Sequence, residues 1–181
     1  PEKLAAVTGT NGKTSTAELT RQLWRMAGHR AASIGTLGIV TSEEQVTTGM
    51  TTPDVVTFLS NLSGLEREGI SHAIFEATSH GLDQYRVAGV FAKTVAFTNL
   101  SRDHLDYHET MEAYFEAKMR LFDEIAADDA TAVIWADDEW SGPAIARAKA
   151  RELRLLTVGE TGSDVRLLSR KTTQLGQEVE I

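Results

Sequence analysis

A short glycine-rich stretch near the start of the chain carries the clearest chemical signal. Gly9 and Gly12 lead directly into Lys13 and Thr14, between an apolar run typical of a strand and a segment typical of a helix. Glycines let backbone N–H groups close on phosphate oxygens, a helix N-terminus supplies further donors, lysine adds positive charge and the threonine hydroxyl can bind Mg²⁺. The alternative is a plain turn with a helix cap, and the loop is contracted, because Val7 stands where the usual pattern has its first glycine. The flanking strand and helix favour phosphate binding by residues Gly9, Thr10, Asn11, Gly12, Lys13, Thr14 and Ser15.

Two further polar residues stand near the ends of predicted strands. Glu76 follows a nearly apolar run, and His104 lies in the polar segment after the next predicted strand. Because open parallel sheets bind ligands at the carboxyl ends of their strands, we expect both side chains near Thr14. Each residue alone is more often structural, Glu76 as a salt-bridged strand end and His104 as a loop histidine. Together they indicate a Mg²⁺ ligand or water-holding carboxylate at Glu76, and a second metal or a phosphate contact at His104.

Lys118 occupies an unexpected place on a predicted helix. At about 100° per residue, segment 110–126 gathers its apolar residues on one stripe, and Lys118 falls in the middle of that stripe. Burying an ammonium ion is costly unless it is paired, deprotonated or modified. One alternative is a side chain that runs along the core to reach water. The interpretation we favour is a functional lysine, since a neutral amine can take up CO₂ to become a carbamate, an anionic oxygen ligand for Mg²⁺.

Two other pairs of residues suit a second substrate. Thr51 and Thr52 precede Pro53, where a helix is predicted to begin with Thr52 as a candidate cap, so their hydroxyl and N–H groups could meet an anion. Gln84 and Arg86 offer an amide and a fork-shaped donor for a carboxylate or phosphate. The structural alternatives are simple helix capping and a solvated arginine.

An α/β fold with a mostly parallel central sheet flanked by helices must position these residues. Apolar β-rich runs alternate with helical patterns, which is typical of parallel strands joined by crossover helices. Residues 36–48 could add a small hairpin beside the sheet, and residues 164–181 predict a small antiparallel pair of strands. The predicted strands are 3–8, 31–35, 72–78, 94–99, 131–135 and 154–158, and the predicted helices are 13–27, 53–68, 110–126 and about 141–152.

Composition narrows the class of protein. The 181 residues suffice to bury the core of one domain, and a net charge of −8 disfavours a nucleic-acid surface. The chain has no cysteine, which fits the cytoplasm where we expect it, and no segment predicts a membrane helix or signal peptide. We expect a monomer. The start at Pro1 and the end at Ile181, inside a strand-like run, predict a piece excised from a longer protein.

From Ala6 to about Glu139 the chain resembles the central ATP-binding domain of the Mur ligases, the ATP-dependent amino-acid ligases of peptidoglycan synthesis. The loop from Thr8 to Thr14 matches the contracted phosphate loop of that family. A longer run is typical of the branch that adds the third residue to UDP-N-acetylmuramoyl-L-alanyl-D-glutamate: Phe97-Thr98-Asn99-Leu100-Ser101-Arg102-Asp103-His104-Leu105-Asp106-Tyr107-His108. Tyr114, Ala117, Lys118, Leu121 and Phe122 follow it at the expected distance.

The resemblance implies that residues 1–181 form a P-loop-type nucleotide-binding domain, which is inactive without an N-terminal UDP-binding domain and a C-terminal amino-acid-binding domain. It implies that Lys13 binds the phosphates of ATP, that Thr14 and Glu76 hold one Mg²⁺, and that His104 and a carbamylated Lys118 hold another. The substrate carboxylate would attack the γ-phosphate to give an acyl phosphate, from which the amine of diaminopimelate or lysine displaces phosphate. The residues implied to bind the UDP-muramoyl dipeptide are Thr51, Thr52, Thr78, Gln84 and Arg86.

Three positions depart from the family pattern. Thr78 replaces a serine, Ser15 replaces a threonine, and Trp135 stands where the family has the asparagine that touches adenine. We expect Trp135 to pack on the face of the adenine ring instead. Three alternatives stay open: the same domain of folylpolyglutamate or cyanophycin synthetase, a metal hydrolase with a carbamylated lysine, and a non-catalytic nucleotide-binding module. The run 102–108 argues against the two other synthetases.

Overall fold

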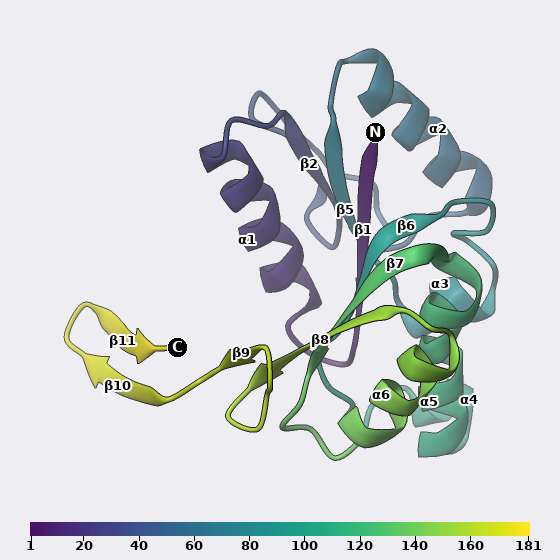
Figure 1. Ribbon diagram of the computed structural model, residues 1–181. Helices are drawn as coiled ribbons and strands as arrows, with labels where there is room; N and C mark the ends of the chain where they lie inside the picture. Colours follow the sequence, from purple (N-terminus) through teal and green to yellow (C-terminus); the bar gives the residue numbers. More distant parts are fainter.

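The computed structural model describes residues 1–181 and confirms the predicted α/β fold with a mostly parallel sheet (Figure 1). The main sheet has nine strands in the order β4-β3-β2-β5-β1-β6-β7-β8-β9. Neighbouring strands from β2 to β9 are parallel, while β3 and β4 form the hairpin expected beside the sheet. The strands are β1 (Lys3–Thr8), β2 (Ala31–Gly35), β3 (Gly38–Val40), β4 (Gln45–Val46), β5 (His72–Glu76), β6 (Ala92–Phe97), β7 (Ala126–Trp135), β8 (Arg154–Gly159) and β9 (Val165–Arg166).

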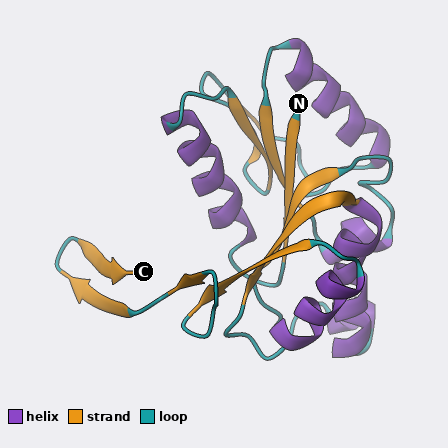
Figure 2. Cartoon of the chain, viewed as in Figure 1, coloured by secondary structure: helices purple, strands orange, loops and turns teal.

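Helices cover the two faces of the sheet unequally. Along β1, Ala5 and Val7 pack toward α1 in a small cluster with Ala17, whereas Leu4 and Ala6 belong to the larger core under the helices of the other face. This alternation is the period of two that strand geometry imposes on a sheet buried on both sides. Figures 1 and 2 show α1 on one side of the sheet and α2, α5 and α6 on the other. The helices are α1 (Lys13–Met26), α2 (Val55–Arg67), α3 (Ser79–Asp83), α4 (Leu105–His108), α5 (Met111–Arg120), the π-helix η1 (Leu121–Ile125) and α6 (Ser141–Ala150).

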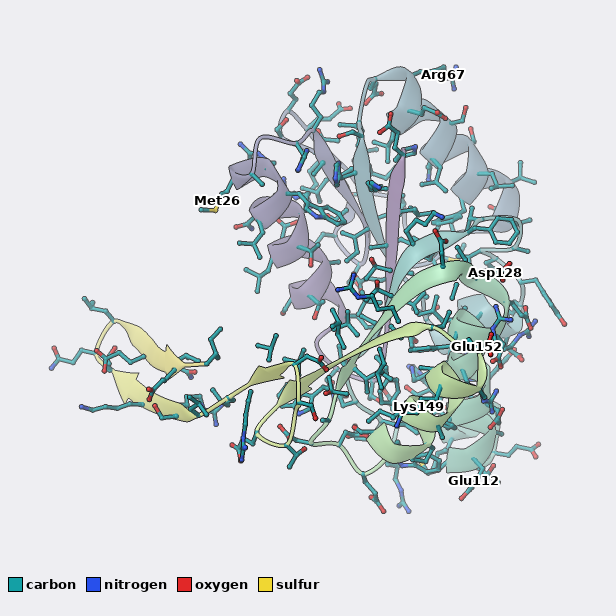
Figure 3. The ribbon with its side chains drawn as sticks, viewed as in Figure 1. Met26, Arg67, Glu112, Asp128, Lys149 and Glu152 are labelled. Atoms are coloured by element: carbon teal, nitrogen blue, oxygen red, sulfur yellow. The ribbon has the colours of Figure 1, made fainter.

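The outer faces of the helices carry charged side chains. Arg67 on α2, Glu112 on α5 and Lys149 on α6 point away from the sheet (Figure 3). None of the helices combines the length and the apolar character needed to cross a bilayer. Helix α2 buries Phe58, Leu62 and Leu65 in the larger core, as amphipathic crossover helices do, whereas α1 leaves Leu19, Leu23 and Met26 exposed.

The predicted start of the second helix at Pro53 is wrong. Asp54 is the N-cap of α2, because its carboxylate accepts hydrogen bonds from the N–H groups of Val56 and Thr57, both at 3.1 Å. Thr52, the residue proposed as a cap, is buried, and its hydroxyl is used elsewhere. An aspartate two residues later therefore provides the cap that the threonine was expected to provide.

Strand β6 (92–97 against the predicted 94–99) and the ends of α1 and α6 differ by only one or two residues, whereas three other elements differ in ways that have a structural reason. Strand β5 ends at Glu76 rather than at residue 78, because the hydroxyl of Thr78 accepts the N–H of Gly81 at 3.0 Å and caps the unpredicted helix α3. The predicted helix 110–126 divides into α5 and the π-helix η1, whose apolar residues Leu121, Phe122 and Ile125 are buried. Strand β7 begins at Ala126 instead of residue 131 and has a register shift against β6.

The C-terminal region only partly matches the expected antiparallel pair. Val165 and Arg166 form β9, which instead joins the main sheet parallel to β8. Strands β10 (Ser169–Thr173) and β11 (Gly176–Glu180) form the small antiparallel hairpin. In Figure 1 this hairpin, drawn in yellow, projects from the rest of the domain. The expected β appendage is thus present but shorter than residues 164–181.

Candidate functional site

The glycine-rich loop joins β1 to α1 and is fixed against the end of β6. Gly9 has φ 143° and Gly12 has φ 84°, values that favour glycine. A Cβ atom on Gly9 would lie 1.9 Å from Oγ1 of Thr98, so the close approach of the two segments also requires a glycine. The carbonyl and the side-chain oxygen of Asn99 accept the N–H groups of Thr10 and Asn11 at 2.9 and 3.0 Å. The loop is therefore held in place by backbone and side chain together.

This loop has the features of an anion-binding site. Gly12 is the N-cap of α1 and contributes no side-chain hydrogen bond, so the N–H groups of the first helical turn can meet an anion. The ammonium group of Lys13 lies within the loop and donates to the carbonyls of Gly9 and Thr10 at 2.9 and 2.8 Å. Burial lowers the pKa of Lys13, and the nearby charges of Glu76 and Asp103 oppose that shift. The loop therefore fits the phosphate groups expected of it.

Glu76 is a buried carboxylate beside the loop, because β1 and β5 are adjacent parallel strands. Its Oε2 accepts the hydroxyl of Thr14 at 2.9 Å, and its Oε1 accepts the backbone N–H of Thr36 at 2.8 Å. A Cβ atom on Gly35 would lie 2.1 Å from Oε1 of Glu76, so only glycine leaves room for the carboxylate there. The hydroxyl of Thr14 and the carboxylate of Glu76 are hard oxygen ligands of the kind that suits Mg²⁺.

A cavity of about 590 Å³ brings most of the predicted residues together. Thr14, Glu76 and His104 all line it, as the argument from strand ends requires. Gly9, Ser15, Gln84 and Lys118 do not line it, although Lys118 contacts the loop from behind. The lining residues are Thr10, Asn11, Gly12, Lys13, Thr14, Thr36, Gly49, Met50, Thr51, Thr52, Glu76, Thr78, His80, Arg86 and His104.

Residues far apart in sequence form the second wall of the cavity. The buried hydroxyl of Thr52 donates to the carbonyl of Glu76 at 3.0 Å and lies 3.1 Å from the hydroxyl of Thr78. The guanidinium of Arg86 donates to the carbonyl of Thr52 at 3.0 Å and to Oε1 of Gln84 at 2.5 Å. Thr52 therefore links strand β5 to this wall, while Arg86 presents a cation to the cavity.

Sequence reasoning missed Thr36, Gly49, Met50 and His80 as lining residues. Thr36 directly follows β2, so the rule that found Glu76 could also have found it; its hydroxyl lies 3.1 Å from that of Thr51. His80 belongs to α3, which was not predicted, and its ring centroid lies 5.0 Å from that of His104. Burial and then the charge of His104 lower the pKa of His80.

Lys118 is almost wholly buried, at 1% exposure, as its place in the apolar stripe predicts. Its Nζ donates to the carbonyl of Gly9 at 2.8 Å and lies 4.3 Å from the ring centroid of Tyr114. Burial and then the charge of Lys13 lower the pKa of Lys118 well below its usual value. The alternative in which the side chain reaches water is therefore wrong, and a buried amine lies directly behind the phosphate loop.

His104 is placed differently from Lys118. It has a left-handed backbone, with φ 51°, and its half-exposed ring lines the cavity with Nε2 3.5 Å from a carboxylate oxygen of Asp103. The ring of Tyr114 lies next to both residues, 6.0 Å from the His104 ring by centroids. Nowhere does the domain gather three or more His, Cys, Asp or Glu side chains into a metal-binding group. A Mg²⁺ ion here would need phosphate oxygens and water to complete its ligands, which is its usual mode of binding.

Trp135 lies at the end of β7 beside a second, smaller cavity. Its side chain is 51% exposed, and its indole N–H donates to Asp137 at 3.1 Å. This cavity, of about 210 Å³, is mainly apolar, with lining residues Trp135, Asp137, Val158, Gly159, Val165, Leu167 and Ile181. The flat ring is thus available to a planar group at the same edge of the sheet as the phosphate loop.

Comparisons with known proteins agree with this geometry. A family model described as Mur ligase middle domain matches residues 7–181. The sequence is 59% identical to a UDP-N-acetylmuramoyl-L-alanyl-D-glutamate–2,6-diaminopimelate ligase from Zymomonas mobilis, over 99% of this chain and 37% of the relative. A solved structure of a ligase with the same name superposes with a TM-score of 0.88 at 34% identity, over 99% of this chain and 37% of that chain.

A more distant enzyme shares only the fold. Folylpolyglutamate synthase from Mycobacterium tuberculosis, solved with ADP, superposes with a TM-score of 0.73 at 16% identity, over 98% of this chain and 46% of that one. The chain spans just 37% of the length of the diaminopimelate ligases it resembles, so it corresponds to one part of a longer enzyme in those relatives.

Proposed function

The chain belongs to the Mur ligase middle-domain family, and from that premise we propose that it is the ATP- and Mg²⁺-binding domain of a ligase that adds 2,6-diaminopimelate to UDP-N-acetylmuramoyl-L-alanyl-D-glutamate. One observation carries the proposal: Lys13, Thr14 and Glu76 share a single cavity with Thr51 and Arg86. A phosphate-binding wall and a wall suited to an anionic second substrate therefore face the same space. The names of the similar ligases support diaminopimelate as the amino acid.

The loop and α1 would bind the triphosphate. Backbone N–H groups of residues 12–15, at the start of α1, would meet the phosphate oxygens, and Lys13 adds a positive charge from within the loop. The Thr14 hydroxyl and the Glu76 carboxylate, 2.9 Å apart, would hold one Mg²⁺ together with phosphate oxygens. When bound, Mg²⁺ offsets the negative charge that gathers on the γ-phosphate during transfer. Glu76 is held for this task by the backbone N–H of Thr36.

The opposite wall would orient the UDP-muramoyl dipeptide. Thr51 offers a hydroxyl, and Arg86 offers the remaining donors of its guanidinium to a carboxylate or phosphate. Thr52 and Thr78 stabilise this wall through their own hydrogen bonds. The substrate carboxylate oxygen would bond to the γ-phosphorus as the bond to ADP breaks, and the amine would then attack the acyl carbon and release phosphate. Lys13 and Arg86 would therefore act on charge and orientation, without becoming covalently bonded.

Lys118 would serve as a carbamate beside His104. A neutral amine attacks CO₂, a C–N bond forms and the nitrogen releases one proton, so the side chain changes from a neutral amine to an anion. The lowered pKa of the buried Lys118 favours the neutral amine that this reaction needs. With the ring of His104 on the cavity side, the pair would hold a second Mg²⁺ near the phosphates.

The remaining parts of the ligase would lie outside residues 1–181. We assign UDP binding to an N-terminal domain and amino-acid binding to a C-terminal domain, in keeping with the 37% share of the relatives that this chain spans. The middle domain alone would bind ATP weakly and would not complete the reaction.

The test is turnover by the longer protein. We expect phosphate release from ATP to require both UDP-N-acetylmuramoyl-L-alanyl-D-glutamate and diaminopimelate, and to fall by about 100-fold or more in Lys13→Ala. Lys93→Ala is the matched control. Lys93 is exposed on β6, does not line the cavity, and forms an ion pair with Asp129 at 2.6 Å. Turnover with a folate and glutamate instead, or hydrolysis independent of the muramoyl substrate, would contradict the proposal.

A further inference from the structure

Tyr107 connects the polar run 102–108 to the end of helix α3, although it does not itself line the cavity. It lies on α4, within the run 102–108, and its hydroxyl donates to Oδ2 of Asp83 at 2.7 Å. The same oxygen accepts the side-chain N–H of Gln84 at 3.3 Å. Its ring packs against His80, with centroids 4.2 Å apart. One side chain thus contacts the end of α3 by two hydrogen bonds and a ring contact.

These contacts fix the orientation of the Gln84 amide. A phenol has a single proton, and Asp83 takes it, so toward Gln84 the Tyr107 oxygen can only accept. The amide nitrogen of Gln84 must therefore face Tyr107, which turns its oxygen toward Arg86. That oxygen accepts Nη2 of Arg86 at 2.5 Å, and Nη1 of Arg86 donates to the carbonyl of Thr52 at 3.0 Å. The phenol hydroxyl controls a chain of hydrogen bonds that ends at the cavity wall.

We propose that Tyr107 is a positioning residue for the UDP-muramoyl dipeptide, acting through Gln84 to hold the guanidinium of Arg86 in its binding orientation. This inference rests on the proposed function. Arginine has many rotamers, and a guanidinium that is already oriented loses less freedom when it binds an anion. Without the phenol hydroxyl, the amide nitrogen of Gln84 loses its acceptor, and the side chain is no longer fixed on the Tyr107 side. Gln84 then holds Arg86 less firmly, while the bond from Arg86 to the carbonyl of Thr52 remains.

The end of α3 that Tyr107 contacts is itself firmly held. Nη1 of Arg120 on α5 donates to the carbonyl of Asp83 at 3.1 Å, and its guanidinium lies 3.9 Å from the ring centroid of Tyr85. Removing the phenol hydroxyl alone should therefore leave the backbone in place and change only the side-chain relay. Removing the hydroxyl thus tests whether Tyr107 positions the substrate through Gln84 or only holds α3 and α4 together.

The experiment is steady-state kinetics of the longer ligase carrying Tyr107→Phe. We expect the KM for UDP-N-acetylmuramoyl-L-alanyl-D-glutamate to rise by about five-fold, the effect of losing one ordinary hydrogen bond. The kcat and the KM for ATP should stay within about two-fold of the wild type, because the phosphate loop is untouched. Tyr85→Phe is the control: this exposed neighbour keeps its ring on Arg120, and its hydroxyl makes no hydrogen bond to Gln84, so the KM for the muramoyl substrate should not change.

A double mutant tests whether the effect passes through Gln84. In a Gln84→Leu background, Tyr107→Phe should raise the KM no further, because the relay is already broken. Full additivity of the two substitutions would overturn the proposal, as would an unchanged KM in Tyr107→Phe. A fall in kcat and melting temperature with no change in that KM would show a structural clamp and would also overturn it. If the wild-type enzyme neither binds nor turns over the muramoyl substrate, the proposed function fails first, and this inference fails with it.

Discussion

Replacing Lys118 by methionine separates the stability of the domain from its proposed chemistry. Methionine has a similar length and no charge, so the buried space stays filled. The substitution removes one hydrogen bond to the carbonyl of Gly9 and the contact with the Tyr114 ring. That carbonyl keeps a donor, because Lys13 also bonds to it at 2.9 Å. The substitution therefore leaves no buried acceptor unpaired.

Opposing effects determine the expected change in stability. Losing the hydrogen bond costs about 0.5–1.5 kcal/mol, and losing the ring contact costs up to about 2 kcal/mol. Against this, the protein no longer buries an amine whose pKa is lowered by burial and by Lys13, which relieves about 1.4 kcal/mol for each pKa unit. Because these effects oppose one another, the free energy of unfolding should change less in Lys118→Met than in Lys118→Ala, which would leave a cavity costing about 2–5 kcal/mol.

Catalysis should respond very differently. If Lys118 carries a carbamate that binds Mg²⁺, Lys118→Met should lower kcat of the longer ligase by about 100-fold or more, with a smaller effect on ATP affinity. Urea unfolding, phosphate-release kinetics and ¹³C NMR after equilibration with ¹³C-bicarbonate provide the three measurements. A kcat within about three-fold of the wild type, together with no carbamate signal in the wild-type protein, would refute the reasoning.

Three further substitutions probe the domain. Gly35→Ala should destabilise it by about 1–3 kcal/mol and weaken MgATP binding by calorimetry, because the new Cβ would lie 2.1 Å from the Glu76 carboxylate, whereas Gly142→Ala, with open space around it, should not. Hydrogen bonds from Arg21 on the same helix lower the pKa of Glu18 from 4.5 to about 2. The wild-type protein should therefore lose at most about 3 kcal/mol of stability, present above pH 4.5, as the pH falls toward 2. In Glu18→Gln the free energy of unfolding, measured in urea, should depend less on pH over this range. Trp135→Asn should raise the ATP-over-GTP ratio of kcat/KM, since ring stacking tolerates any base, and an unchanged ratio would contradict stacking.

The sequence predicts those site residues that follow from one rule, the binding of ligands at the carboxyl ends of parallel strands. Thr14, Glu76 and His104 line one cavity because parallel strands end at the same edge and because β5, β1 and β6 are neighbours in the sheet. The sequence does not reveal that β2 lies beside β5, which is what brings Thr36 to the carboxylate of Glu76. In the chain β3, β4 and α2 lie between these two strands, and in the sheet β1 could equally have separated them.

Short helices and irregular turns escape prediction for a different reason. Helices α3 and α4 have five and four residues, too few to show the 3.6-residue period, so the relay through Tyr107 and the place of His80 are not visible in the sequence. The π-helix η1 keeps an apolar stripe that an α-helix would also show, so nothing local distinguishes the two. These short elements form because of tertiary packing, which the sequence does not show, whereas the long helices can be recognised from their periodicity.

The carbonyl of Gly9 connects the two lysines of the site and makes their proposed roles compatible. It accepts Nζ of Lys13 at 2.9 Å and Nζ of Lys118 at 2.8 Å, so two amines approach one loop position from two sides. Two cations there repel each other, which is one reason that the pKa of Lys118 is lowered. Carbamylation would keep the bond to Gly9, because the carbamate nitrogen retains one N–H, and it would replace the repulsion by attraction to Lys13. The bond to Gly9 is therefore open to the neutral amine and to the carbamate, and the change of charge falls beside the place where the phosphates would bind.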